Sequence, residues 1–251
     1  NTTASYNTAY GYSTLLTNVD GHDNTALGYG ALAVSTNAAR NTAVGSNALG
    51  ANTSGTQNVA VGEVALDVNQ DGNYNTGVGR HALSSAVSAH NNTGIGRNAL
   101  GSTTGGDNTA VGTNAGGDCT SGIRNVFVGI DAGVNNGSAQ ENCYIGRRAG
   151  QNATGSYGTA LGTEALQNCT GNFNTAIGIQ AMQSNTSGVE NVAVGRAALQ
   201  TQQTASNNTA VGVESMKSNT TGTQNTATGV GSLSANTTGS NNTAQGYNAL
   251  N

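Results

Sequence analysis

A short motif, Asn-Thr-Ala-x-Gly-x-x-Ala-Leu, recurs along the whole chain and constrains its fold more than any other feature. There are fifteen repeats, spaced 17 residues apart in eleven of the fourteen steps and 16 residues apart in the other three. We number each repeat from its opening residue, position 0, and these residues are Asn7, Asn24, Asn41, Asn58, Asn75, Asn92, Asn108, Asn125, Asn142, Gly158, Asn174, Asn191, Asn208, Asn225 and Asn242. The unbroken register predicts one continuous repeat domain over residues 1–251, with no internal boundary.

The composition excludes the thick core of an ordinary mixed globular domain. The 251 residues include 38 Gly and no Pro, and only 35% are hydrophobic, 8% charged and 4% aromatic. The small formal net charge of −4 and the absence of Pro argue against a disordered chain, and the absence of Pro also argues against collagen. The 8 Lys and Arg residues leave no basic surface for nucleic acid, and no apolar run is long enough for membrane insertion. Any core must therefore be thin and long.

The period selects the fold class. The segment Asn-Thr-Ala-Val-Gly is short and β-branched, and 17 residues are too few for the helix pairs of helical repeat proteins. One turn of a parallel β-solenoid, with two or three short strands per coil, fits this length. Coils stacked about 4.8 Å apart would form a rod of roughly 65–70 Å. We therefore predict an all-β fold, a parallel β-solenoid or β-roll of fifteen coils.

Two positions that hold a small residue in every repeat indicate where the coil turns. Position +4 is glycine in every repeat, which indicates a corner with positive φ or a backbone approach too close for a Cβ atom. Position −3 is Gly in ten repeats and Ala in the others, which predicts a second, less strict corner. The corner glycines at position +4 include Gly28, Gly45, Gly62, Gly112 and Gly195.

Asn occupies position 0 in fourteen of the fifteen repeats, and Gly158 is the exception. A stacked Asn column can pass side-chain amide hydrogen bonds from coil to coil and so satisfy backbone groups in a thin rod. We interpret this column as structural.

Positions +2 and +8 exchange volume. Position +2 is Ala or Gly in thirteen repeats but is Phe127 and Tyr144 in two, and in those two repeats the Leu at position +8 is replaced by Gly133 and Gly150. The repeat before them is an exception, because Gly116 replaces the Leu there while position +2 keeps the small Ala110. A large residue appears at one position where another vanishes, as expected for two columns that fill one interior. Both columns are therefore predicted to point into the coil.

Strand alternation then turns positions +1 and +3 outward. Position +1 is Thr in eleven repeats and otherwise Val or Cys, and position +3 is Val, Ile, Leu or Tyr in thirteen. A soluble monomer rarely exposes so long an apolar stripe, so we expect a partner. The economical partner is another copy of the chain, and three copies with their stripes turned to a shared axis predict a parallel homotrimer.

We find no constellation for catalysis, a metal or a cofactor, and we do not expect an enzyme. His22, His81 and His90 fall in exposed columns several coils apart, without an acid and a nucleophile at a repeated phase. The remaining candidates for recognition are exposed aromatic side chains, whose ring faces could stack on the sugars of a cell-surface glycan or receptor. These candidate surface contacts are Tyr12, Tyr29, Tyr74, Tyr157, Phe173 and Tyr247.

The odd number of cysteines does not imply a disulfide framework. Cys119, Cys143 and Cys169 are expected in three different columns, each as a small buried residue.

The motif, followed by Asn-Thr-Thr-Gly at residues 219–222 and 236–239, resembles the repeat of phage and bacterial tail-fibre proteins, many of which carry an endosialidase-type chaperone. It is similar, more loosely, to the head repeats of trimeric autotransporter adhesins. The resemblance covers essentially the whole chain. It implies a trimeric fibre with a β-roll shaft, displayed outside a cell or on a virion and used for attachment. We expect the chain to be a segment of a longer protein.

A second function fits the same pattern. A Thr column on a flat β face can order water, as in an ice-binding β-solenoid, although here the companion column at position +3 is Val, Ile or Leu rather than Thr. A third alternative, a polysaccharide lyase or hydrolase on a β-helix, needs paired acids on one face, and the 12 acids are scattered. The sequence therefore favours a structural and adhesive fibre, with ice binding as the alternative.

Overall fold

The computed structural model describes residues 3–251, which form strands and turns and no helix. The chain divides into two compact units, Asn1–Asn125 and Val126–Asn251. Each unit is a parallel β-solenoid. The first unit contains β1 (Thr8–Tyr10), β2 (Thr25–Leu27), β3 (Thr42–Val44), β4 (Val59–Val61), β5 (Thr76–Val78), β6 (Thr93–Ile95) and β7 (Thr109–Val111). The second contains β8 (Val126–Val128), β9 (Cys143–Ile145), β10 (Thr159–Leu161), β11 (Thr175–Ile177), β12 (Val192–Val194), β13 (Thr209–Val211), β14 (Thr226–Thr228) and β15 (Thr243–Gln245).

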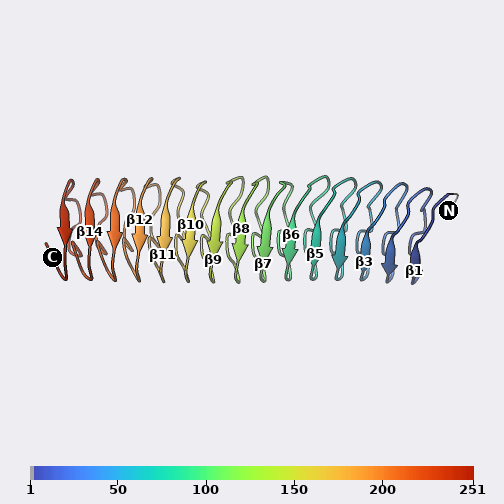
Figure 1. The fold of residues 1–251 in the computed structure, drawn as a ribbon, viewed down its shortest axis with the longest axis horizontal. Coiled ribbons are helices and arrows are strands. Elements are labelled where there is room, and N and C mark those ends of the chain that lie inside the picture. The colour runs from blue at the N-terminus through green and yellow to red at the C-terminus, as the bar shows by residue number, and fades with distance from the viewer. Residues whose placement is uncertain (1–2) are drawn as a thin grey trace. The chain divides into compact units, whose positions relative to one another are not determined.

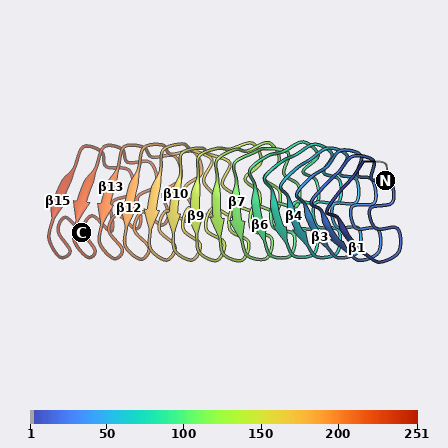
Figure 2. The same ribbon diagram turned by 45° about the vertical axis from the view of Figure 1, so that its right-hand side comes forward.

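Each coil contributes one strand of 3 residues, at positions +1 to +3, and not the two or three strands predicted from the period. Within each unit, neighbouring coils pair these strands in parallel without slippage, as where Thr25 pairs with Thr42 and Thr175 with Val192. The arrows in Figures 1 and 2 show the strands of each unit side by side on one face. The parallel β-solenoid predicted from the repeat is thus confirmed, with a single short strand per coil.

The rest of the coil bends because three of its positions adopt left-handed backbone angles. Residues at positions −1, +6 and +8 all have positive φ, between 47° and 61° when they are not glycine. Left-handed residues cannot continue a strand, which explains why only one segment per coil is extended. The same segments still bond from coil to coil, as when the Leu49 N–H donates to the Ala65 carbonyl at 3.0 Å.

The corner glycines at position +4 combine the two features expected of a position that is always glycine, a positive φ and a backbone approach too close for a Cβ atom. Gly195 has a φ of 133°, and a Cβ atom there would lie 2.4 Å from the carbonyl oxygen of Gly212 in the next coil. Position −3 differs, because its glycines do not have positive φ and the alanines that replace them, such as Ala205, are buried. The second corner expected at position −3 is therefore a close approach of two coils, and the nearby left-handed residue is at position −1.

The interior consists of thin stacked columns. Between the first and last coils, the Ala residues at positions +2 and +7 and the Leu residues at position +8 are almost completely buried, as for Ala43, Ala48 and Leu49. A left-handed conformation costs a leucine roughly 1–2 kcal/mol. Burying its side chain recovers about 1.5–3 kcal/mol, so the core stabilises a backbone conformation that leucine disfavours.

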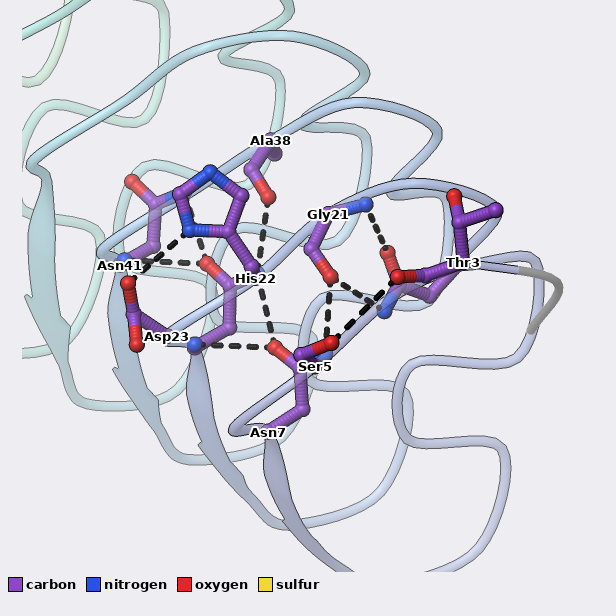
Figure 3. Close-up of polar contacts among 10 residues, drawn as sticks. Thr3, Ser5, Asn7, Gly21, His22, Asp23, Ala38 and Asn41 are labelled. Atoms are coloured by element: carbon purple, nitrogen blue, oxygen red, sulfur yellow. Dashed lines mark hydrogen bonds and ion pairs between the residues drawn. The ribbon is translucent and has the colours of Figure 1, made fainter.

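The Asn column at position 0 is buried and bonds each coil to the next. The Asn24 Nδ2 donates to the Ala38 carbonyl at 2.8 Å, while its Oδ1 accepts from the Asn41 N–H at 3.0 Å. Figure 3 shows the start of this column, where the Asn7 amide reaches the Gly21 carbonyl. The structural interpretation of the column is confirmed.

A second amide column lies at position +11 and was not recognised in the sequence. Asn219 is completely buried, and its Nδ2 donates to the Gly222 carbonyl at 2.8 Å. The same carbonyl accepts the position 0 amide of Asn208 at 2.9 Å. Two side-chain amides therefore share one backbone carbonyl at position −3.

The predicted exchange of volume between positions +2 and +8 is confirmed. Phe127 and Tyr144 are buried, and a Cβ atom at Gly133 or Gly150 would lie 2.3 Å from the ring of the aromatic residue in the same coil. The Tyr144 ring also explains the break in the Asn column, because a Cβ atom at Gly158 would lie 2.9 Å from its hydroxyl.

This compensation predicts a rescue experiment. Tyr144→Ala should lower the free energy of unfolding by about 3–5 kcal/mol, because it leaves a cavity. Adding Gly150→Leu should recover most of that loss, since leucine occupies position +8 with φ of 50° at Leu166. Gly150→Leu alone should destabilise the chain through overlap with the Tyr144 ring. Denaturant unfolding of the two single variants and the double variant measures the coupling, and additive losses would contradict the shared volume.

Candidate functional site: the outward strand face

The outward faces of the strands form an apolar surface in each unit. The middle residue of nearly every strand is buried, while its two neighbours are exposed or half-buried. Leu27, Ile95 and Val111 are exposed in the first unit, and Ile145, Leu161, Ile177 and Val211 in the second, each with 37–46% of its surface accessible. We call positions +1 and +3 of all strands the outward row.

The threonines of the outward row leave their hydroxyls unused. None of the hydroxyls at position +1, from Thr8 to Thr243, has a hydrogen-bond partner among residues 3–251. Threonines at position +12 behave differently, because Thr36 and Thr220 donate their hydroxyls to carbonyls of the next coil at 2.9 and 3.0 Å. The row thus presents aligned hydroxyl groups that take no part in the hydrogen bonds between coils.

Two edges border the outward row in every coil. The residue at position −1, just before the strand, and the residue at position +5, just after the corner glycine, are mostly exposed. We call these columns the leading edge and the trailing edge. They contain all six aromatic residues predicted as surface contacts, Tyr74, Tyr157 and Phe173 on the leading edge and Tyr12, Tyr29 and Tyr247 on the trailing edge.

Four of these aromatic residues stack on one another. The rings of Tyr12 and Tyr29 lie 5.5 Å apart with an interplanar angle of 10°, and those of Tyr157 and Phe173 lie 4.8 Å apart with an angle of 7°. Each pair comes from consecutive coils, and the two rings cover one face of each other. The covered faces are therefore not available to stack on a sugar. Tyr74 and Tyr247 have no stacked partner within the described residues and are exposed.

A polar ladder follows the trailing edge of the second unit. Glu164 accepts hydrogen bonds from Gln180 and Gln183 at 3.1 and 3.0 Å, and from Arg147 at 3.0 Å. The hydrogen bond from Gln180, with the charge of Arg147, lowers the pKa of the Glu164 carboxyl. Glu214 is held in the same way by Arg196 at 2.9 Å. These contacts fix the charged side chains beside the row.

The cysteines occupy two columns rather than three. Cys119 and Cys169 both lie at position +11, in the second amide column, where they are buried. Burial raises the pKa of each of these thiols to about 11. Cys143 lies at position +1 of β9, in the outward row, and is half-buried. It is the cysteine that the row presents to a partner or to solvent.

The described residues contain no pocket and no group of three or more His, Cys, Asp or Glu side chains placed to bind a metal. His22 lies several coils from His81 and His90, which belong to the same repeat, and its side chain forms a hydrogen bond with the adjacent Asp23 at 2.9 Å (Figure 3). Among residues 3–251 there is also no helix with the length and apolar character of a transmembrane segment.

The geometry therefore offers one extended surface, the outward row with its two edges, as the candidate site. The chain matches no protein-family model, and no curated protein shows significant similarity to it.

Proposed function

We propose that the chain is the shaft of a homotrimeric fibre, displayed outside a cell or on a virion, that mediates attachment. The observation that carries this proposal is the outward row, an apolar strip along the strand face of each unit. Burying it among three copies removes it from water, and coils that repeat the same contacts supply length. The exposed columns away from the row are then available to a cell-surface glycan or receptor.

Threefold packing suits the width of the strand face. The extended segment from position 0 to +4 is about 15 Å wide at roughly 3.3 Å per residue. Three such faces that close into a triangle leave a radius of about 4 Å to the axis, enough for one Val or Thr side chain from each copy. The hydroxyls of position +1 can then bond across the axis.

Two measurements on the native chain test the proposal: the number of reactive thiols, and the mass in solution by light scattering. We expect a trimer in which no thiol reacts rapidly, because Cys119 and Cys169 are buried in the coil and Cys143 is covered by the partners. Val211→Glu, in the same unit, should release a monomer with one reactive thiol, and adding Cys143→Thr should abolish that reaction. A native monomer with a rapidly reacting Cys143 would refute the trimer.

An ice-binding solenoid is the second candidate, and the unpartnered threonine hydroxyls favour it. Thermal hysteresis of the purified chain is its test. Activity that disappears when Thr175 and Thr209 are both replaced by Val, in a chain that is monomeric in solution, would assign the row to ice rather than to a fibre.

A further inference from the structure

The two edges of the outward row differ in chemistry along three consecutive coils of the second unit. The leading edge there presents Tyr157, Phe173 and Glu190. The trailing edge of the same three coils presents Thr163, Ile179 and Arg196. Each coil thus holds a matched couple: a tyrosine with a threonine, a phenylalanine with an isoleucine, and an acid with a base.

The members of a couple cannot meet within one chain. Phe173 and Ile179 lie on either side of β11, six residues apart, which is about 15–20 Å along an extended segment. Both side chains are more than half exposed, at 55% and 53%. Glu190 makes no ion pair within residues 3–251, and Arg196 contacts Glu214 through one of its five N–H donors.

The backbone at the leading edge adds an independent argument. Tyr157 and Phe173 have φ of 60° and 59°, a left-handed conformation that favours Gly or Asn and costs an aromatic residue roughly 1–2 kcal/mol. The leucines that adopt this conformation at position +8 are mostly buried, which offsets the cost. The stacking of Tyr157 on Phe173 offsets part of this cost, and a partner that covers the outer faces of the two rings would offset more of it.

From these observations we infer that, in the proposed homotrimer, the leading edge of each copy docks against the trailing edge of its neighbour at the same coil, and that these contacts set the parallel register. The inference rests on the proposed function. Cyclic threefold symmetry brings the end of one strand face to the start of the next, so every copy uses both edges. Phe173 then packs on Ile179 of the partner subunit, and Glu190 pairs with Arg196 of the partner subunit.

Only one register satisfies all three couples. A shift of one coil in one direction places Glu190 opposite Ile179, which leaves a carboxylate against an apolar side chain. A shift in the other direction places Glu190 opposite Val213, which again leaves a carboxylate against an apolar side chain and without its base. The in-register trimer is therefore favoured by charge and by apolar contact together.

Disulfide trapping tests the inference. The native cysteines are first replaced by the residues typical of their columns, Cys119→Asn, Cys143→Thr and Cys169→Asn. In that chain, Phe173→Cys with Ile179→Cys should give a covalent trimer after mild oxidation, on a non-reducing denaturing gel. A disulfide requires Cα atoms about 4–7 Å apart, so the two cysteines of one chain cannot pair. The matched control, Phe173→Cys with Arg196→Cys, places the thiols one coil out of register and should give little covalent product.

The possible results separate this inference from the proposed function. Covalent trimers with the in-register pair support it. Efficient trapping of the control pair instead, or a trimeric mass with neither pair trapped, overturns the register while the trimer stands. A monomeric mass, or a product that stops at a covalent dimer, refutes the threefold assembly itself.

Discussion

The Val111→Glu variant should be a folded monomer. Val111 ends β7 in the outward row with 37% of its surface exposed, so glutamate there is solvated in a single chain and leaves the coil intact. In a trimer the same substitution places three carboxylates around an apolar axis, and each uncompensated buried charge costs several kcal/mol. Light scattering should therefore show the mass of one chain, with the circular dichroism spectrum of the native protein.

The chain offers a matched control for this experiment. Val87 is exposed to nearly the same extent, 39%, but lies outside the strands and away from the outward row. Val87→Glu adds the same charge and should remain trimeric. If Val111→Glu kept its trimeric mass, or if both variants dissociated, the outward row would not be the contact surface.

Gly195→Ala should strongly destabilise the second unit by the addition of a single methyl group. Gly195 has a φ of 133°, outside the range of other residues, and the new Cβ would lie 2.4 Å from the Gly212 oxygen. Both atoms in this overlap belong to positions that the strand ladder fixes. We expect a loss of about 4 kcal/mol or more in the free energy of unfolding, measured by denaturant titration.

Gly171→Ala is the corresponding control, since it adds the same methyl group at position −3. The φ of Gly171 is not in the left-handed region, and alanines stand naturally at this position, as at Ala139 and Ala205, each followed by glycine in the next coil. Gly171 is also followed by a glycine, Gly188. A Cβ atom at Gly171 would lie 2.0 Å from the Gly188 oxygen, so the two coils must shift apart there, as they do around Ala139 and Ala205. Because no left-handed φ adds to this cost, Gly171→Ala should destabilise the chain less than Gly195→Ala, and equal losses would contradict the distinction between the two columns.

The sequence predicts the coil well where a residue type has one physical explanation. A glycine at position +4 in every repeat identifies the corner, and the opposite changes at Tyr144 and Gly150 identify two inward columns. The buried Asn ladder follows from the same logic. These features depend on local sterics and on contacts between equivalent positions, both of which a repeat makes visible.

Other features could not be read from residue type. Leucine is a poor candidate for a left-handed residue, so position +8 gave no sign that it bends the coil and shortens the strands. The second amide column is interrupted by residues such as Cys119, which hides its pattern. The stacking of Tyr157 on Phe173 did leave a signal, because the two occupy the same position in consecutive repeats and adjacent coils bring such residues together.

The exchange between Phe127 and Gly133 is complete within one coil, and β8 still pairs with β9 through the same register as the other strands of the second unit. A coil is therefore a unit that a gene can gain or lose as a whole. Unequal recombination that removes or duplicates seventeen codons joins two surfaces that already fit, so a gene of this kind can change the reach of its product without passing through a misfolded ancestor.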